Sequence, residues 1–158
     1  MVDGATAIAA GFALGLTGLL LWISIADLNS WRIPDRLNGA LCALGLISAA
    51  WSGALLTGIA GMLIGAGGAL LIRFGYFKLR GRQGLGLGDV KFLGAAGAWV
   101  GPDGLPAVLL LASLSGLLLV LAQRAAGRET GAASRIAFGP HLALGLLAAW
   151  VVKTFELV

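Results

Sequence analysis

Two aspartates, Asp27 and Asp89, are the residues of this chain whose type and position best suit chemistry. Asp27 closes the first long apolar stretch, and Asp89 ends the glycine-rich run Gly84-Leu-Gly-Leu-Gly-Asp89. Carboxylates are costly within a bilayer, so each is a candidate functional residue. Two carboxylates at one site cannot both ionise comfortably and hold one proton between them. The ionised member can take a proton from water while the protonated member donates to a substrate carbonyl, which is the chemistry of aspartyl proteases.

Each of these acids also has a purely structural interpretation. Asp89 precedes an apolar stretch, where Asp is a favoured N-cap. Asp27 could be an interfacial acid at a helix end, but the helix dipole disfavours an acid at a C-terminus. The glycines before Asp89, including Gly86 and Gly88, would let a backbone or an extended substrate approach it closely. We therefore expect both acids to be catalytic.

The remaining reactive residues have simpler explanations. Asp35 follows Pro34 and is expected to cap the next helix. Lys91 lies two residues beyond Asp89 and does not share its helix face, so snorkelling or an ion pair elsewhere is as reasonable as tuning of the acids. His141 follows Pro140 with no second His, Cys or acid nearby, which favours a hydrogen-bonded structural role. Cys42 is expected to pack in the core. Because it is the single cysteine, an internal disulfide and a Cys-rich zinc site are excluded.

Composition places these residues in a membrane protein. The chain has 158 residues, of which 59% are hydrophobic and 11% are charged, whereas soluble domains carry about 25% charge. Its N-terminus, Met-Val-Asp-Gly, lacks the basic region of a signal peptide, so we expect the first apolar stretch to be retained. We predict an all-α, polytopic membrane bundle formed by a single domain, residues 1–158.

Six transmembrane segments are predicted, because roughly 20 apolar residues cross a bilayer as a helix. The fourth is short and could begin inside the protein or be re-entrant, which is tolerated where protein surrounds it. The expected segments are Ala5–Ala26, Leu37–Trp51, Thr57–Ile72, Val90–Val100, Leu105–Ala122 and Ile136–Val152.

Basic residues predict the orientation of these segments. Ten of the eleven fall in the connections after the first, third and fifth segments or at the start of the fourth, and Lys153 alone lies on the other side. The positive-inside rule makes the basic face cytoplasmic and places both termini outside, with Asp27 and Asp89 at the cytoplasmic edge. Topology and anionic lipid account for the net charge of +4, so a nucleic-acid partner is not expected.

Pairs of glycines four residues apart predict close helix packing. They are Gly11 and Gly15, Gly61 and Gly65, and Gly97 and Gly101. Such spacing lets helix backbones approach closely in lipid.

Three sequence blocks together resemble the type IV prepilin leader peptidases. Asp27-Leu-Asn-Ser-Trp-Arg-Ile-Pro-Asp-Arg-Leu is similar to that family's D-x(6)-I/L-P-D/N-x-L signature, and Gly86-Leu-Gly-Asp-Val-Lys-Phe-Leu to its GxGD block. Ala137-Phe-Gly-Pro-His-Leu-Ala-Leu-Gly, which contains Gly139 and Pro140, is similar to its third block, except that His141 stands where an apolar residue is common. The three blocks occur in the family's order.

The resemblance implies a six-helix intramembrane aspartyl peptidase of the bacterial inner membrane. It assigns Asp27 and Asp89 as the catalytic pair and makes the basic leader of a prepilin or pseudopilin the substrate. It leaves the oligomeric state open. The cytoplasmic methyltransferase domain and CxxC pairs of longer members have no counterpart in this sequence, so cleavage without methylation, metal or other cofactor is expected.

Two other function classes remain open from the residues alone. A proton-coupled carrier could use Asp27 and Asp89 as proton sites, but carriers place such sites near the midplane between repeated halves. A catalytically silent scaffold would have no need of two costly acids.

Overall fold

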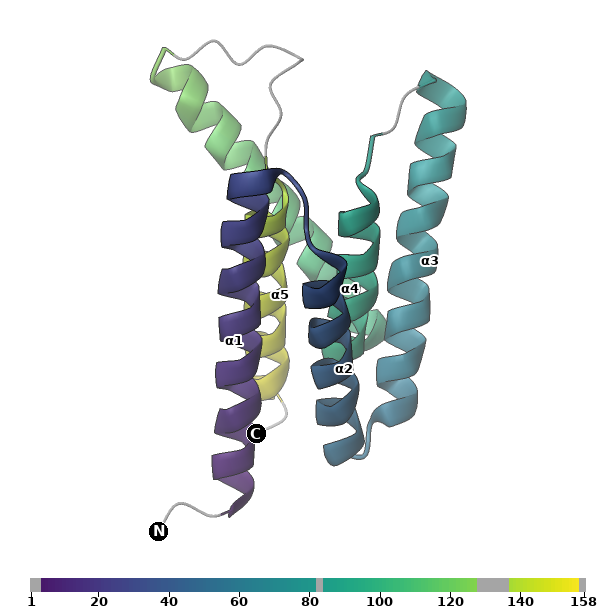
Figure 1. Ribbon diagram of the computed structural model, residues 1–158, viewed down its shortest axis with the longest axis vertical. Coiled ribbons are helices and arrows are strands. Elements are labelled where there is room, and N and C mark those ends of the chain that lie inside the picture. The colour runs from purple at the N-terminus through teal and green to yellow at the C-terminus, as the bar shows by residue number, and fades with distance from the viewer. Residues whose placement is uncertain (1–3, 82–83, 128–136, 157–158) are drawn as a thin grey trace.

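The computed structural model describes residues 4–81, 84–127 and 137–156, and these form five helices without any strand. Figure 1 shows α1 (Gly4–Ser30), α2 (Asp35–Trp51), α3 (Leu55–Arg80), α4 (Leu87–Ala125) and α5 (Gly139–Glu156). The all-α prediction is confirmed. By length and composition α1 (from Thr6), α3 and α4 could each cross a membrane, and α5 is a shorter apolar helix.

Helix α4 covers both the fourth and the fifth predicted segments, with a break at Gly101. Gly101 has φ 73° and ψ −178°, a conformation that only glycine adopts readily. Pro102 follows directly and has no N–H to continue the helical ladder. In Figure 1 the chain descends through residues 87–100, turns at this break and rises again through residues 102–125.

The helices α1 and α3 are longer than predicted. Helix α1 continues to Ser30 and so includes Asp27, and α3 continues to Arg80. The predicted last segment began at Ile136, which lies outside the described residues, and α5 begins at Gly139. The α1–α2 connection, the last turn of α3 and the start of α4 lie at one end of the bundle, opposite the first turn of α1 and the last turn of α5 (Figure 1).

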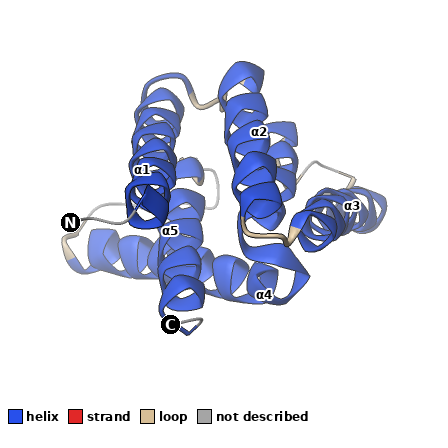
Figure 2. Ribbon diagram, turned by 90° about the horizontal axis from the view of Figure 1, so that it is seen from below, coloured by secondary structure: helices blue, strands red, loops and turns tan. Residues whose placement is uncertain are grey.

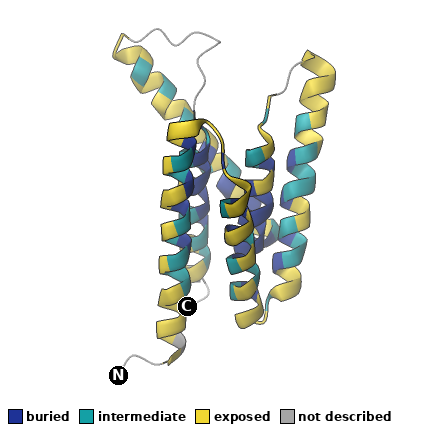
Figure 3. Cartoon of the chain, viewed as in Figure 1, coloured by how far each residue is buried: buried dark blue, intermediate teal, exposed yellow. Residues whose placement is uncertain are grey.

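Residues 87–100 form the most enclosed helix of the bundle. All residues from Phe92 to Gly101 are buried, and α4 contacts α2, α3 and α5. Seen from one end, α4 passes behind α5 and reaches α3 (Figure 2). Figure 3 shows buried positions facing inward and exposed positions on the outer surfaces. The short fourth segment is therefore surrounded by protein, the condition under which irregular backbone is tolerated at membrane depth.

Glycines bring α3 and α4 into backbone contact. A Cβ on Gly61 would collide with the carbonyl oxygen of Gly97, and a Cβ on Gly97 would collide with that of Gly61. A Cβ on Gly65 would likewise meet the carbonyl of Leu93. The predicted close packing is confirmed here, whereas Gly11 faces open space and makes no such contact.

A side chain from α5 caps the end of the first part of α4, residues 87–100. The Nζ of Lys153 donates to the carbonyl oxygen of Val100 at 3.0 Å. A cation at a helix C-terminus stabilises the free carbonyls left by the break at Gly101. Lys153, the lone base predicted on that side, therefore has a structural partner.

Candidate active site

Asp27 joins the end of α1 to the start of α5. Its side chain is 6% exposed, and its Oδ2 accepts a hydrogen bond from the backbone N–H of Gly139 at 2.7 Å. The first N–H groups of a helix have no partner within the helix, so they favour an acceptor. This contact offsets the cost of an acid near the C-terminus of α1. It is the only hydrogen bond to the Asp27 carboxylate within the part of the chain described.

Asp89 lies in the first turn of α4, three residues after the N-cap. Gly86 is the N-cap, so the structural alternative considered for Asp89, that it caps the helix from that position, does not hold. The backbone of Gly86 hydrogen-bonds to the Asp89 carboxylate. An acid in the third helical position that receives the N-cap N–H is half of a capping box. This bond orients the Asp89 carboxylate, and Asp89 still lines the adjacent cavity.

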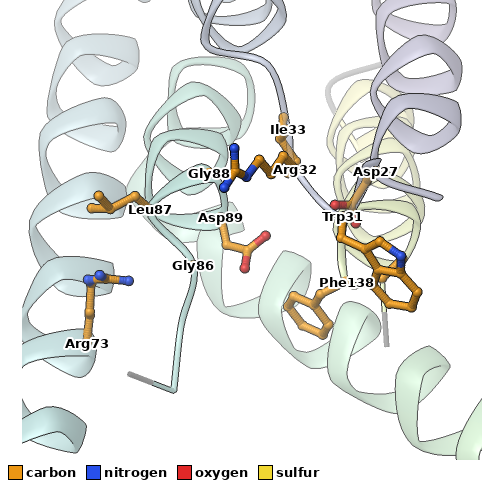
Figure 4. A pocket seen from close by; sticks show the side chains of 11 residues that line it. Asp27, Trp31, Arg32, Ile33, Arg73, Gly86, Leu87, Gly88, Asp89 and Phe138 are labelled. Carbon is orange, nitrogen blue, oxygen red and sulfur yellow. The ribbon is translucent and has the colours of Figure 1, made fainter. Parts of the chain in front are cut away.

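Both acids line one cavity of about 490 Å³ at the end of the bundle that holds the α1–α2 and α3–α4 connections. They are close enough for their charges to interact. In Figure 4 the Asp89 carboxylate points across the cavity toward the side where Asp27 lies, with the ring of Phe138 beneath them. The cavity is lined by Asp27, Trp31, Arg32, Ile33, Arg73, Gly86, Leu87, Gly88, Asp89, Ala137 and Phe138.

Two arginines of the lining were not predicted as site residues. Arg73, from α3, donates from Nη1 to the carbonyl oxygen of Leu85, in the segment just before Asp89 (Figure 4). Arg32 follows α1, and in Figure 4 its side chain extends toward Gly88, above Asp89 and away from Asp27. Arg32 falls within the first sequence block, which offered a signal, whereas nothing in the spacing of Arg73 links it to Leu85.

The glycines and the proline of the second and third sequence blocks lie in the cavity wall or next to Asp27. Gly86 and Gly88 line it directly. Gly139 supplies the N–H to Asp27, and a Cβ there would lie 2.8 Å from Asp27 Oδ2. Pro140 is the second residue of α5, where proline's missing N–H costs no helical bond.

Asp35 and Lys91 pair with each other. Pro34 is the N-cap of α2, and Asp35 makes no side-chain capping bond, so the capping prediction is wrong. Instead Asp35 Oδ1 lies 2.6 Å from Lys91 Nζ, and both side chains are substantially exposed. Of the two roles left open for Lys91, the structure shows the ion pair.

His141 and Cys42 lie among packing contacts. The Nδ1 of His141 is 2.9 Å from Ser115 Oγ on α4, which confirms the hydrogen-bonded histidine. Cys42 packs against the core, with its Sγ 3.4 Å from Met62 Sδ. Within the described ranges, no three His, Cys, Asp or Glu side chains gather closely enough to hold a metal ion.

Asn38 is a polar residue that sequence reasoning missed. It is 4% exposed on α2, and its Nδ2 donates to the carbonyl oxygen of Gly88 at 3.1 Å. Polarity within an apolar segment was the signal that could have singled it out.

Sequence comparisons identify the family of this chain. The profile of the type IV leader peptidase family matches residues 6–121. A "Prepilin leader peptidase/N-methyltransferase" of Escherichia coli (strain K12) is 38% identical over 128 residues, covering 80% of this chain and 56% of that protein. A protein of the same description from Pectobacterium carotovorum is 34% identical over 148 residues, which cover 92% of this chain and 52% of that protein. The chain thus spans about half the length of these relatives. No solved structure matches it.

Proposed function

Because the chain belongs to the type IV leader peptidase family, we propose that it is an aspartyl endopeptidase that cleaves the basic leader from type IV prepilins or pseudopilins. The observation that carries the proposal is the presence of Asp27 and Asp89 in one cavity, each oriented by a backbone N–H. The described helices would act together as one peptidase unit.

The reaction uses the two acids as a base and an acid. The ionised aspartate takes a proton from water, whose oxygen attacks the scissile carbonyl carbon. The protonated aspartate donates its proton to the carbonyl oxygen, which gives a tetrahedral diol. Proton transfer to the amide nitrogen then lets the carbon–nitrogen bond break. The products are the leader's carboxyl end and a new N-terminal amine, and the pair again holds one proton.

The alternative of a proton-coupled carrier has no support. Both acids lie at one end of the bundle rather than at its middle, where carriers bind their ions. The matching family and relatives are peptidases by description.

Cleavage of a leader-bearing prepilin by the purified protein tests the proposal. We expect incubation in detergent or liposomes to shorten the prepilin by the mass of its leader and to create one new N-terminus, both read by mass spectrometry. The same pilin without its leader is the control and should stay intact. A folded wild-type protein that leaves the prepilin whole would refute the peptidase assignment.

We further propose that the chain crosses a bacterial inner membrane six times, with the cavity at the cytoplasmic edge and both termini outside. Support comes from the break at Gly101, which gives α4 two parts that run in opposite senses (Figure 1). The α1–α2 connection, the start of α2 and the last turns of α3 and α4 all lie toward the cavity end of the bundle in Figure 1. These parts carry Arg32, Arg36, Lys78, Arg80 and Arg124, as the positive-inside rule requires of a cytoplasmic face. Arg82, Arg128 and Arg135 contributed to the prediction and lie outside the described residues.

Single-cysteine labelling tests this orientation. In a Cys42→Ala background, Arg80→Cys at the cavity end should react with a membrane-impermeant thiol reagent only after the membrane is opened. Ser52→Cys, exposed in the α2–α3 turn at the other end, should react in intact cells. The reverse pattern would place the cavity outside and overturn the orientation.

A further inference from the structure

The buried side chain of Asn38 is only partly satisfied. Its Nδ2 donates to Gly88, fifty residues away, while its Oδ1 has no hydrogen-bond partner among the described residues. A buried polar atom without a partner costs stability, and an apolar residue of similar shape avoids that cost. Stability alone therefore does not explain an asparagine at this position in α2.

The bond from Asn38 reaches the peptide that carries Asp89. Gly88 immediately precedes Asp89, and Asn38 holds its carbonyl oxygen from across the helix interface. The Ile33 side chain packs on the same glycine: a Cβ on Gly88 would lie 3.3 Å from Ile33 Cβ. The glycines make the backbone before Asp89 conformationally permissive. The contacts to Gly88 therefore restrict the position of Asp89.

The ion pair of Asp35 with Lys91 makes a second connection between the same elements. It joins Asp35, in the first turn of α2, to Lys91, the fifth residue of α4, so Asp89 lies between two anchored positions, Gly88 and Lys91. Exposed ion pairs contribute little to stability. The pair is thus a weaker restraint than the buried bond from Asn38.

We propose that Asn38 is a positioning residue for Asp89, and that it acts through the Gly88 carbonyl with the Asp35–Lys91 pair as a weaker second restraint. The inference rests on the proposed peptidase function. Asp27 is anchored from α5 and Asp89 from α2, so the distance between the acids depends on how both helices pack around α4. Asn38 touches neither acid and would act on the reaction only through the backbone.

Replacing Asn38 with leucine separates positioning from stability. We expect Asn38→Leu to lower kcat by about ten- to a hundredfold, because small displacements of a catalytic group cost that much, and to change KM less than about threefold. Its thermal unfolding temperature in detergent should not fall, since the unpaired Oδ1 is removed as well. Asn29→Leu, the same change at an exposed position of α1, is the matched control and should keep wild-type kcat.

Four further variants keep the test decisive. Asn38→Ala serves the same comparison if the leucine variant does not accumulate. Asp35→Lys and Lys91→Asp should each lower kcat by about two- to fivefold, and the double exchange should restore it, because the pair is reformed with its charges reversed.

The outcomes distinguish this inference from the proposed function. Active wild type with an unchanged kcat in Asn38→Leu would refute the positioning role alone. A loss of kcat that parallels a loss of thermal stability would also refute it, because a purely structural role predicts that pattern. Wild type that does not cleave prepilin would refute the peptidase proposal and this inference with it.

Discussion

Asp27→Asn and Asp89→Asn are each expected to reduce leader cleavage by about a thousandfold or more, because general acid–base catalysis supplies effects of this order. Asparagine keeps the size and much of the hydrogen bonding of aspartate but cannot share the proton of the pair. In Asp27→Asn the new amide oxygen could still accept the N–H of Gly139, so the α1–α5 contact need not be lost. Both variants should therefore insert and fold.

Cleavage rate and thermal unfolding of the two variants, measured side by side, check this prediction. Asp103→Asn is a suitable control, because Asp103 is an exposed carboxylate near the break in α4, at the other end of the bundle. It should cleave at the wild-type rate. Near-normal cleavage by either Asp27→Asn or Asp89→Asn would remove that aspartate from the catalytic pair.

Gly139→Ala is expected to reduce cleavage by about a hundredfold, the scale of loss that follows a displacement of about 1 Å. The added Cβ would lie 2.8 Å from Oδ2 of Asp27 and 2.9 Å from its Cβ, closer than real Cβ atoms come. The aspartate must therefore move, or α5 must shift away from α1. Either movement disturbs the bond from the Gly139 N–H.

The control for this variant is Gly75→Ala in α3. Gly75 is also helical, but a Cβ there meets nothing within 4 Å. Alanine forms helix better than glycine, so Gly75→Ala should keep full activity and equal or greater stability. Cleavage rates of the two alanine variants at equal folded concentration give the comparison. Gly139→Ala with wild-type activity would mean that the position of Asp27 does not depend on this contact.

The sequence predicted the helical fold and the meeting of Asp27 and Asp89 because both rest on strong local signals. Long apolar stretches define the helices, and an acid that ends such a stretch is conspicuous. The break in α4 was also visible, since Gly101 and Pro102 separate two apolar stretches. What hydropathy could not reveal is how tight the reversal is, since the two helical parts meet directly at Gly101.

The errors concern contacts that depend on three-dimensional packing. Asp35 was expected as an N-cap, yet Pro34 holds that position because α2 begins earlier than the apolar residues suggest. For the same reason Gly86, and not Asp89, is the N-cap of α4. Arg73 was missed because its partner, Leu85, is a backbone carbonyl, which carries no sequence signature. Contacts to main-chain atoms are set by the fold rather than by residue type.

The bond between Asp27 and Gly139 spans 112 residues, so it ties α1 to a helix that is synthesised much later. Chains are synthesised from the N-terminus, and early segments fold while later ones are still on the ribosome. A growing chain that has already inserted both aspartates still lacks the N–H that orients the first of them. The order of translation thus delays completion of the cavity until α5 arrives, and a nascent chain halted before Gly139 carries both acids without an assembled site.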